Sequence, residues 1–250
     1  MTHDLEQLYD KAFFLDNVAD SLPMARWFAP KIKKELGITS VLDVGCASGH
    51  WLSCYEKEGV EVNGIEGAKN AIPFMLIDPT KILIHDLRNP LEDDYSVDLV
   101  MSIEVAEHIE PEYADTYVDT LTKHDADYII MTAAPPGQGG VGHWNLQPKS
   151  YWVNKFNDKG YTRFDSFEDK IIEWAKEARE TKTTNPDYLW MTTEGDSTGQ
   201  PAGQVRDRIA YWGSHEDAME GDLSKIKWGK GEGQVMLPFW WPKNLIVFKK

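Results

Sequence analysis

The chain has 250 residues, of which 42% are hydrophobic and 27% charged, which suits a complete α/β domain and excludes a disordered chain. The formal net charge of −15 repels phosphate backbones, and the basic runs at 31–34 and 249–250 are too short for a binding groove, so free nucleic acid is not an expected partner. The chain has only two cysteines, and it shows neither a charged-then-apolar leader nor a long apolar run. These features predict a cytoplasmic protein without a membrane segment.

Residues 1–36 predict a helical cap. Apolar side chains recur at helical spacing from Leu5 to Leu15, with Phe13 and Phe14 beside them. The stretch from Asp20 to Pro23 predicts the start of a second helix, which ends at Gly37. We expect these helices to pack on the edge of a sheet or over the functional site.

From residue 41 onward, short apolar strands alternate with helical segments. The expected strands are 41–45, 61–65, 81–85, 97–102, 128–132, 161–167 and 244–248, and the expected helices are 49–58, 68–75, 111–123, 148–158 and 168–180. This alternation predicts a doubly wound, mainly parallel seven-stranded sheet with helices on both faces. We take 1–250 as a single domain in which 168–243 forms an insertion or lid before the final strand, because so long an irregular stretch is usually functional.

The stretch Val41–Leu52 reads as a strand, a glycine-bearing turn and the start of a helix. Gly45 and Gly49 let the backbone approach another group closely, and we expect Ser48 to cap the helix. A turn of this kind often holds a nucleotide, because free N–H groups point outward from the helix start. On this turn alone, an ordinary connection in an α/β protein remains an alternative.

Acidic residues follow the next three expected strands. Glu66, Asp86 and Glu104 each come directly after a strand, and ligands of doubly wound sheets bind outside these carboxyl ends. A dinucleotide requires the pattern G-x-G-x-x-G, but Ala47 and His50 occupy two of its three glycine positions. The pattern therefore disfavours a nicotinamide-dependent reductase. An acid two residues before the first glycine suits a cationic ligand with a free amine.

The stretch Val41–Leu52 resembles motif I of the class I S-adenosylmethionine-dependent methyltransferases. Ser102–Ile109, which reads SIEVAEHI, resembles the segment after the fourth strand in the ubiquinone-biosynthesis-like branch of that superfamily. The resemblance spans about 35–165 and the final strand. It implies a Rossmann-like methyltransferase fold and S-adenosylmethionine as the cofactor.

The resemblance also implies which residues contact the cofactor. Asp43 and the residues around it would hold the methionine amine, and Glu66 would bind the ribose hydroxyls. Asp86 would accept a hydrogen bond from the adenine amine. Tyr9 and Phe13 would cover the cofactor; the alternative, with at least equal weight, is that they are ordinary aromatic residues of the core. The complete implied set is Asp43, Gly45, Cys46, Ala47, Gly49, Glu66, Gly67, Asp86, Leu87 and Glu104. Ala47 departs from the glycine that is commoner at its position.

Methyl transfer to a hydroxyl benefits from a general base. We predict His143 as that base, because histidine titrates near neutrality and His143 lies on the loop after the fifth strand. A plain hydrogen-bonding role in the loop is the alternative. The predicted acceptor contacts are His108, Trp144, Asn145 and Gln147, with a structural role as the alternative for His108. No cluster with ligand spacing is visible, so no metal is predicted.

The predicted function is S-adenosylmethionine-dependent methyl transfer, with a hydroxyl of a small molecule or sugar as the acceptor. The alternatives are a protein or nucleic-acid methyltransferase, with specificity encoded in 168–243, and a non-catalytic binding module of the same fold. A homodimer is left open. The insertion carries five aromatic residues that form either a wall of the site or a small core of the insertion itself: Trp190, Tyr211, Trp212, Trp240 and Trp241. It also carries Arg206 and Arg208, which either bind an acidic acceptor or lie at the surface as ordinary exposed charges.

Overall fold

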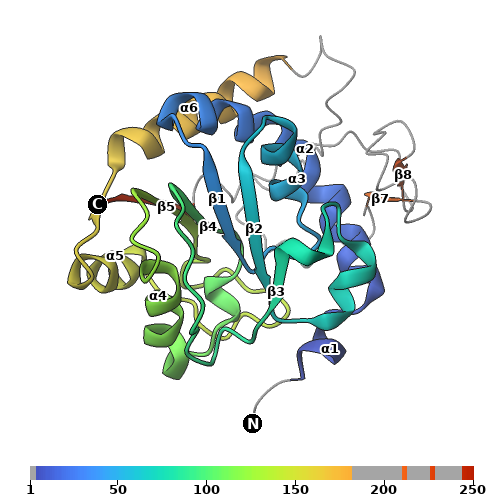
Figure 1. Ribbon diagram of the computed structural model, residues 1–250, viewed down its shortest axis with the longest axis horizontal. Coiled ribbons are helices and arrows are strands. Elements are labelled where there is room, and N and C mark those ends of the chain that lie inside the picture. Colours follow the sequence, from blue (N-terminus) through green and yellow to red (C-terminus); the bar gives the residue numbers. More distant parts are fainter. Residues whose placement is uncertain (1–3, 182–209, 213–225, 229–243) are drawn as a thin grey trace.

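The computed structural model describes residues 4–181, 210–212, 226–228 and 244–250. Its centre is a seven-stranded sheet in the order β3-β2-β1-β4-β5-β9-β6 (Figure 1). The strands are β1 (Ser40–Val44), β2 (Glu61–Glu66), β3 (Ile82–Ile84), β4 (Leu99–Ser102), β5 (Tyr128–Thr132), β6 (Thr162–Arg163) and β9 (Leu245–Lys249). The first five strands pair in parallel, and β9 runs antiparallel to both β5 and β6. This topology confirms the doubly wound, mainly parallel sheet of a Rossmann-like fold.

Helices cover both faces of the sheet (Figure 1). The helices α2 (Lys11–Leu36), α3 (His50–Lys57) and α6 (Asp165–Thr181) pack on one face, and α4 (Ala114–Thr122) and α5 (Lys149–Asp158) pack on the other. Successive side chains of a strand point to opposite faces. Accordingly, Val41 packs in the core on the side of α2, α3 and α6, and its neighbour Leu42 packs in the core on the side of α4 and α5. Both side chains are fully buried. Burial on both faces explains why Val41, Leu42 and Val44 of β1 are all apolar.

The predicted helix start at Asp20–Pro23 is wrong. A short helix, α1 (Leu5–Leu8), is followed by α2, which runs without interruption through Pro23. Proline removes one backbone hydrogen bond from a helix, but the following turns bury Met24, Phe28 and Ile32 against the sheet. Tertiary packing thus outweighs the local signal for a helix start.

The start of α3 also differs from its prediction. Ser48 was expected to cap this helix, but Gly49 occupies the N-cap position with φ of +69° and no side-chain capping bond forms. The Ser48 hydroxyl is buried without a hydrogen-bond partner in the described residues. The sequence pattern of a serine before a helix therefore placed the cap one residue too early.

Several shorter elements complete the described fold. They are 3-10 turns at η1 (Lys69–Phe74), η2 (Pro79–Lys81), η3 (Ala106–His108) and η4 (Pro111–Tyr113). The strand expected at 161–167 is only the two residues of β6, because α6 already begins at Asp165 and carries Phe167 into the core. Within the described residues, no helix combines the length and hydropathy that a membrane span requires.

The predicted insertion at 168–243 contains most of α6 and a two-stranded antiparallel sheet of β7 (Ala210–Trp212) and β8 (Ile226–Trp228). Tyr211 and Trp212 lie on β7. The other aromatic and basic residues singled out in this segment, Trp190, Arg206, Arg208, Trp240 and Trp241, lie outside the described residues. The function of the insertion therefore stays a prediction.

Candidate functional site

A cavity of about 270 Å³ lies outside the carboxyl ends of the parallel strands. Its sheet side is formed by the carboxyl ends of β1 and β2 and by the segments that follow β1, β2, β3 and β4. These contribute Asp43, 45–47, 66–67, 86–88 and 103–105. Because β1 pairs with both β2 and β4, the strand order reverses at this point, where ligands of doubly wound sheets bind. The N-terminal segment closes the opposite side with Leu5, Leu8, Tyr9, Phe13 and Asn17.

The N-terminal cover is fastened to the sheet side by specific contacts. The Asn70 amide on η1 donates hydrogen bonds to the backbone carbonyls of Glu6 and Tyr9. A Cβ added at Gly67 would lie 2.9 Å from Cδ1 of Leu5, so a glycine at the end of β2 lets α1 approach. Figure 1 shows α1 beyond the carboxyl ends of β1 and β2. The predicted role of 1–36 as a helical cap stays a prediction.

The glycine turn after β1 has a tightly constrained backbone. The N–H groups of Gly45 and Cys46 both donate to the carbonyl of Ile65, at 2.8 and 3.0 Å. Gly45 has φ of +80°, and a Cβ there would lie 2.5 Å from Cγ2 of Val105 on the segment after β4. Ala47 has φ of +48°, which is costly for a residue with a Cβ. This turn accepts an alanine where glycine is commoner, but it requires glycine at position 45.

Glu66 is oriented by the turn that it faces. Its Oε2 accepts from the backbone N–H of Ala47 at 2.9 Å, and its Oε1 accepts from the N–H of Ala68 at 2.8 Å. Burial raises the pKa of this carboxyl to about 7, although the backbone N–H groups act in the opposite direction. Each oxygen keeps a lone pair that can accept from a ligand hydroxyl.

Asp43 stands beside Glu66 in the same buried environment. It is 2% exposed, and burial together with the charge of Glu66 raises its pKa to about 8. No lysine or arginine among the described residues forms an ion pair with either carboxyl group. A cationic ligand in the cavity would therefore favour the ionised forms of both acids.

Asp86 is already bound by a neighbouring arginine. The Arg88 guanidinium donates to both carboxylate oxygens of Asp86, at 2.9 Å from Nε to Oδ1 and 2.7 Å from Nη2 to Oδ2. Burial opposes ionisation of Asp86, but these hydrogen bonds hold its pKa below the usual range. Arg88 also lies 3.6 Å from Glu110. A remaining lone pair of Asp86 could still accept a hydrogen bond from an adenine amine. Asp86 is nevertheless not the isolated acceptor that the sequence suggested.

The segment after β4 bends sharply. Glu104 has φ of +57°, and its N–H donates to the Thr132 hydroxyl at 2.6 Å. Three residues later, Glu107 is completely buried on η3. Burial and then the charge of Glu104 raise the pKa of Glu107 well above its usual range. Two acidic groups are thus held close together beside the cavity.

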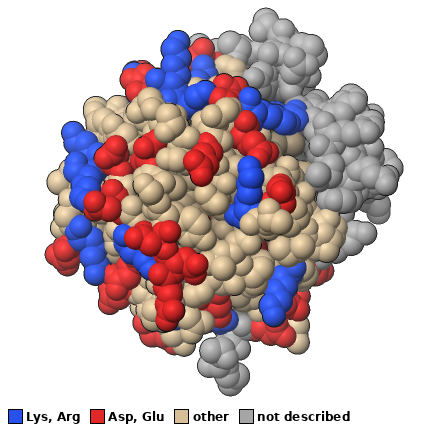
Figure 2. Space-filling view, viewed as in Figure 1, with Lys and Arg blue, Asp and Glu red and all other residues tan. Residues whose placement is uncertain are grey.

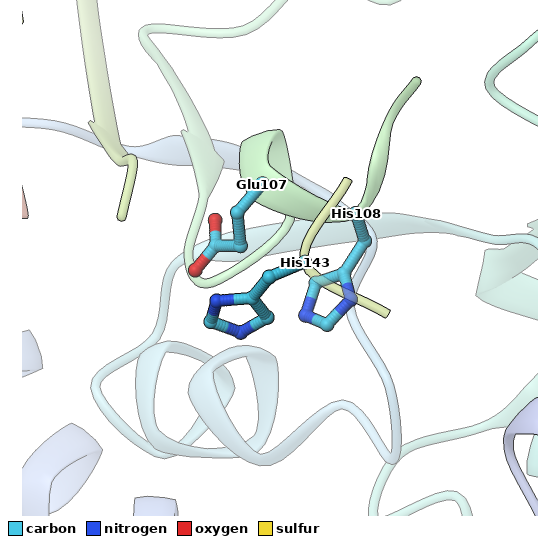
Figure 3. Close-up of side chains that lie close together, drawn as sticks. All are labelled: Glu107, His108 and His143. Carbon is cyan, nitrogen blue, oxygen red and sulfur yellow. The ribbon is translucent and has the colours of Figure 1, made fainter. Parts of the chain in front are cut away.

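The loop after β5 is joined to η3. The N–H groups of Trp144 and Asn145 both donate to the backbone carbonyl of Glu107, at 2.8 and 3.1 Å. The rings of His108 and His143 meet edge to face, with centroids 4.9 Å apart and an interplanar angle of 85° (Figure 3). Burial lowers the pKa of His108 to about 4 and also lowers that of His143. Both imidazoles are therefore neutral near pH 7.

The structure brings most of the predicted site residues to this cavity. Its lining includes the cofactor set Asp43, Gly45, Cys46, Ala47, Glu66, Gly67, Asp86, Leu87 and Glu104, and His108 and Trp144 from the acceptor set. Gly49, His143, Asn145 and Gln147 are not among the lining residues. Gly49 instead starts α3, and Asn145 is buried, with its amide atoms unpartnered among the described residues. The roles assigned to all these residues remain predictions.

Sequence reasoning missed several lining residues. Oδ1 of Asn17 and Nδ1 of His50 are buried without a hydrogen-bond partner in the described residues, and both residues line the cavity. Burial lowers the pKa of His50 to about 3, so this imidazole is neutral. His50 directly follows the glycine turn, which was a usable signal. Asn17 lies within a long helix whose orientation the sequence does not give.

Residues 42–125 match the family model described as a methyltransferase domain. The match begins on β1 and extends past α4, so it contains the glycine turn and the acids that line the cavity. It supports the class I methyltransferase superfamily and S-adenosylmethionine as the cofactor of this domain. The ubiquinone-biosynthesis-like branch remains a prediction. Among curated proteins, no match to the chain was found.

Solved structures of methyltransferases are similar to the chain at low identity. Magnesium protoporphyrin IX methyltransferase (ChlM) from Synechocystis PCC 6803 with bound SAH has 16% identity and a TM-score of 0.47, over 64% of this chain and 84% of that one. The methyltransferase domain of bacterial CtHen1 has 16% identity and a TM-score of 0.45, over 58% and 86%. Burkholderia thailandensis 1,6-didemethyltoxoflavin-N1-methyltransferase has 11% identity and a TM-score of 0.45, over 58% and 69%. Likeness at this level does not identify the acceptor.

Proposed function

We propose that this chain transfers a methyl group from S-adenosylmethionine to a hydroxyl of a small molecule or sugar. The observation that carries the proposal is the pair Asp43 and Glu66, two buried acids near the carboxyl ends of β1 and β2 that line the cavity without a cationic partner in the described residues. A ligand that combines positive charge with hydroxyl donors satisfies both acids. The match of 42–125 to a methyltransferase domain supports this cofactor.

Residues of the cavity fit the parts of such a cofactor. Glu66 would accept from the ribose hydroxyls, since the N–H groups of Ala47 and Ala68 already orient its carboxylate. Asp43 would offset the positive charge of the methionine end. Leu87 would offer an apolar contact for the base, and the unpartnered Asn17 and His50 atoms offer further hydrogen-bonding groups. The cavity thus offers acidic acceptors for the ribose and the methionine end and an apolar contact for the base.

When bound, S-adenosylmethionine supplies an activated methyl group, whose bond to sulfur breaks with its electron pair left on sulfur as a bond to the acceptor oxygen forms. The chain's task is to align the acceptor, exclude water and remove the hydroxyl proton. His108 lines the cavity, and His143 packs against it. His143 remains our predicted base; its ring contacts that of His108, and His143 is not among the lining residues.

The surface supports a small acceptor over a nucleic acid. On the face shown in Figure 2, lysine and arginine side chains are interspersed with aspartate and glutamate, and the described residues of this face form no continuous basic patch. The net charge of −15 has the same consequence at longer range. A small, neutral hydroxyl compound would not be repelled by such a surface.

The proposal is tested with calorimetry and mass spectrometry. The protein should bind S-adenosylmethionine and should pass a labelled methyl group to a hydroxyl compound in a panel of small molecules and sugars. Replacing His143 with alanine should lower turnover about 10²–10⁴-fold while cofactor affinity is kept. Absence of cofactor binding would point to a non-catalytic module, and label found only in protein or RNA would replace the proposed acceptor.

A further inference from the structure

We infer that Glu107, His108 and His143 bind a divalent transition-metal ion next to the cofactor cavity. One ligand atom from each residue lies within 4.8 Å of the other two. Figure 3 shows the carboxylate of Glu107 and the two imidazoles gathered at one place, with Glu107 and His108 extending from η3 and His143 from a separate loop. Ligands about 2 Å from a tetrahedral metal lie roughly 3–4 Å apart, so small side-chain rotations would complete the site.

The backbone holds the two ligand-bearing segments together. The carbonyl of Glu107 accepts hydrogen bonds from the N–H groups of both Trp144 and Asn145, which directly follow His143. Nδ1 of His143 lies 3.1 Å from the carbonyl oxygen of Gln138, a contact that fixes the orientation of the ring. Metal-binding histidines are commonly oriented in this way by a backbone carbonyl. The three side chains therefore meet without needing the metal to assemble the loop.

An independent observation points to a missing ligand at this place. Glu107 is 0% exposed, and neither of its carboxylate oxygens meets hydrogen-bond geometry with a partner in the described part of the chain, although the Glu104 carboxyl group and the backbone N–H of Ala134 lie near enough to influence its pKa. Buried carboxylates without partners are costly, and most buried polar atoms in proteins are satisfied. A bound cation would satisfy both oxygens. The imidazoles of His108 and His143 beside them supply nitrogen donors for the same cation.

The donor set selects the kind of metal. Two imidazoles and one carboxylate are typical of zinc, manganese and iron sites that keep open positions, whereas magnesium and calcium prefer oxygen ligands alone. Because His108 also lines the cavity, an open position of this metal could face the acceptor. This part rests on the proposed function: a hydroxyl bound to the metal loses its proton more readily, which prepares the oxygen for methylation. The metal would then take over the task predicted for a free histidine base.

The sequence alone predicts no metal, because it contains no cluster of ligands at short spacing. Glu107 and His108 are adjacent, but the third ligand comes from the loop after β5. A Cβ at Gly140 would lie 2.4 Å from Nε2 of His143, so this loop needs a glycine to accommodate the ring. The site is thus created by loop geometry that no linear motif expresses.

The test is a manganese titration of metal-stripped protein, followed by electron paramagnetic resonance, because bound manganese loses the six-line signal of the free ion. Wild-type protein should bind one manganese ion per chain, and zinc should displace it. His143→Ala and Glu107→Gln should each weaken manganese binding by at least about tenfold. His85→Ala is the matched control, since its ring contacts the carbonyl of Asn89 and belongs to no part of the cluster.

Each outcome decides the inference. Stripped wild-type protein that binds no manganese or zinc, or variants that bind manganese as tightly as the wild type, would overturn it. Circular dichroism monitors folding, and Glu107→Gln, which keeps the side-chain volume, decides the matter if His143→Ala does not fold. Calorimetry with S-adenosylmethionine is run on the same stripped protein. Failure there would count against the proposed function and leave the metal site intact, whereas normal cofactor binding without metal binding would reject only the metal site.

Discussion

Glu66 and Ala47 are joined by a 2.9 Å hydrogen bond from the backbone N–H of Ala47 to Oε2 of the Glu66 carboxylate. This bond connects the turn after β1 with the end of β2, and it fixes the carboxylate at the wall of the cavity. The same turn also donates two backbone hydrogen bonds to Ile65, the residue before Glu66. The orientation of Glu66 therefore depends on the backbone of the glycine turn.

We first predict that Glu66→Ala weakens S-adenosylmethionine binding by roughly 1–3 kcal/mol, the usual cost of losing charged hydrogen bonds. Glu66→Gln should lose less, because an amide oxygen can still accept from one hydroxyl. Titration calorimetry measures both effects. Glu61→Ala is the matched control, since Glu61 is an exposed acid at the start of the same strand. Equal affinities for wild type and Glu66→Ala would remove Glu66 from the binding site.

The second prediction concerns the pH dependence of cofactor binding. In the free chain the pKa of Asp43 is raised to about 8 and that of Glu66 to about 7. A cationic cofactor favours the ionised acids, so its binding releases protons and its affinity rises from pH 6 to pH 7.5. The expected change is up to about tenfold per pH unit for each acid.

Calorimetry in buffers with different ionisation enthalpies measures this proton release directly. Asp43→Asn should reduce both the affinity and its pH dependence. A wild-type affinity that is constant across this range, with no proton release, would mean that neither acid changes its protonation on binding.

The third prediction concerns the stability of the ligand-free protein. Because the folded-state pKa values of Asp43 and Glu66 lie above the unfolded values of about 4, the folded chain holds these protons more tightly. Their contribution to stability is complete below pH 4 and is lost as the pH rises through the folded pKa values. From this cause, the free energy of unfolding should fall between pH 5 and pH 8.

Urea denaturation of the wild type and of Asp43→Asn tests this sign. The neutral amide of Asp43→Asn cannot ionise, so the free energy of unfolding of this variant should depend less on pH. The difference in unfolding free energy between the two proteins should change by more than about 1 kcal/mol between pH 5 and pH 8. Parallel curves for the two proteins would show that Asp43 has an ordinary pKa in the folded chain.

The fourth prediction compares two positions of the glycine turn. Gly45→Ala should destabilise the fold by roughly 2–5 kcal/mol, because it combines a left-handed backbone with overpacking against Val105. Ala47→Gly should change stability by less than about 1 kcal/mol, since relief of the left-handed backbone is offset by a more flexible unfolded chain.

A double-mutant cycle with Val105→Ala separates the two causes at position 45. Removing the valine methyl groups should recover the overpacking part of the loss, about 1–3 kcal/mol, and leave the backbone part. Strict additivity of the two substitutions would show that Val105 does not restrict this position.

Much of the site follows from the sequence because parallel strands end at a common edge. Asp43, Glu66, Asp86 and Glu104 were expected to meet there, and all four line the cavity. The bounds of β5, Tyr128–Thr132, are those that its apolar run predicts. Local pattern and sheet topology agree in these cases, so the residue order was sufficient.

Other features depend on contacts between distant parts of the chain, and only the tertiary structure decided them. The helix α2 continues through Pro23 because a long face of it is buried against the sheet. Most clearly, Glu107 and His143 meet because the loop after β5 bonds to the backbone of η3. The sequence by itself determined the sheet, its glycine turn and the acids at the strand ends, since these obey local periodicity. The cluster of Glu107, His108 and His143 needed the folded loop, because no local rule fixes the path of an irregular segment.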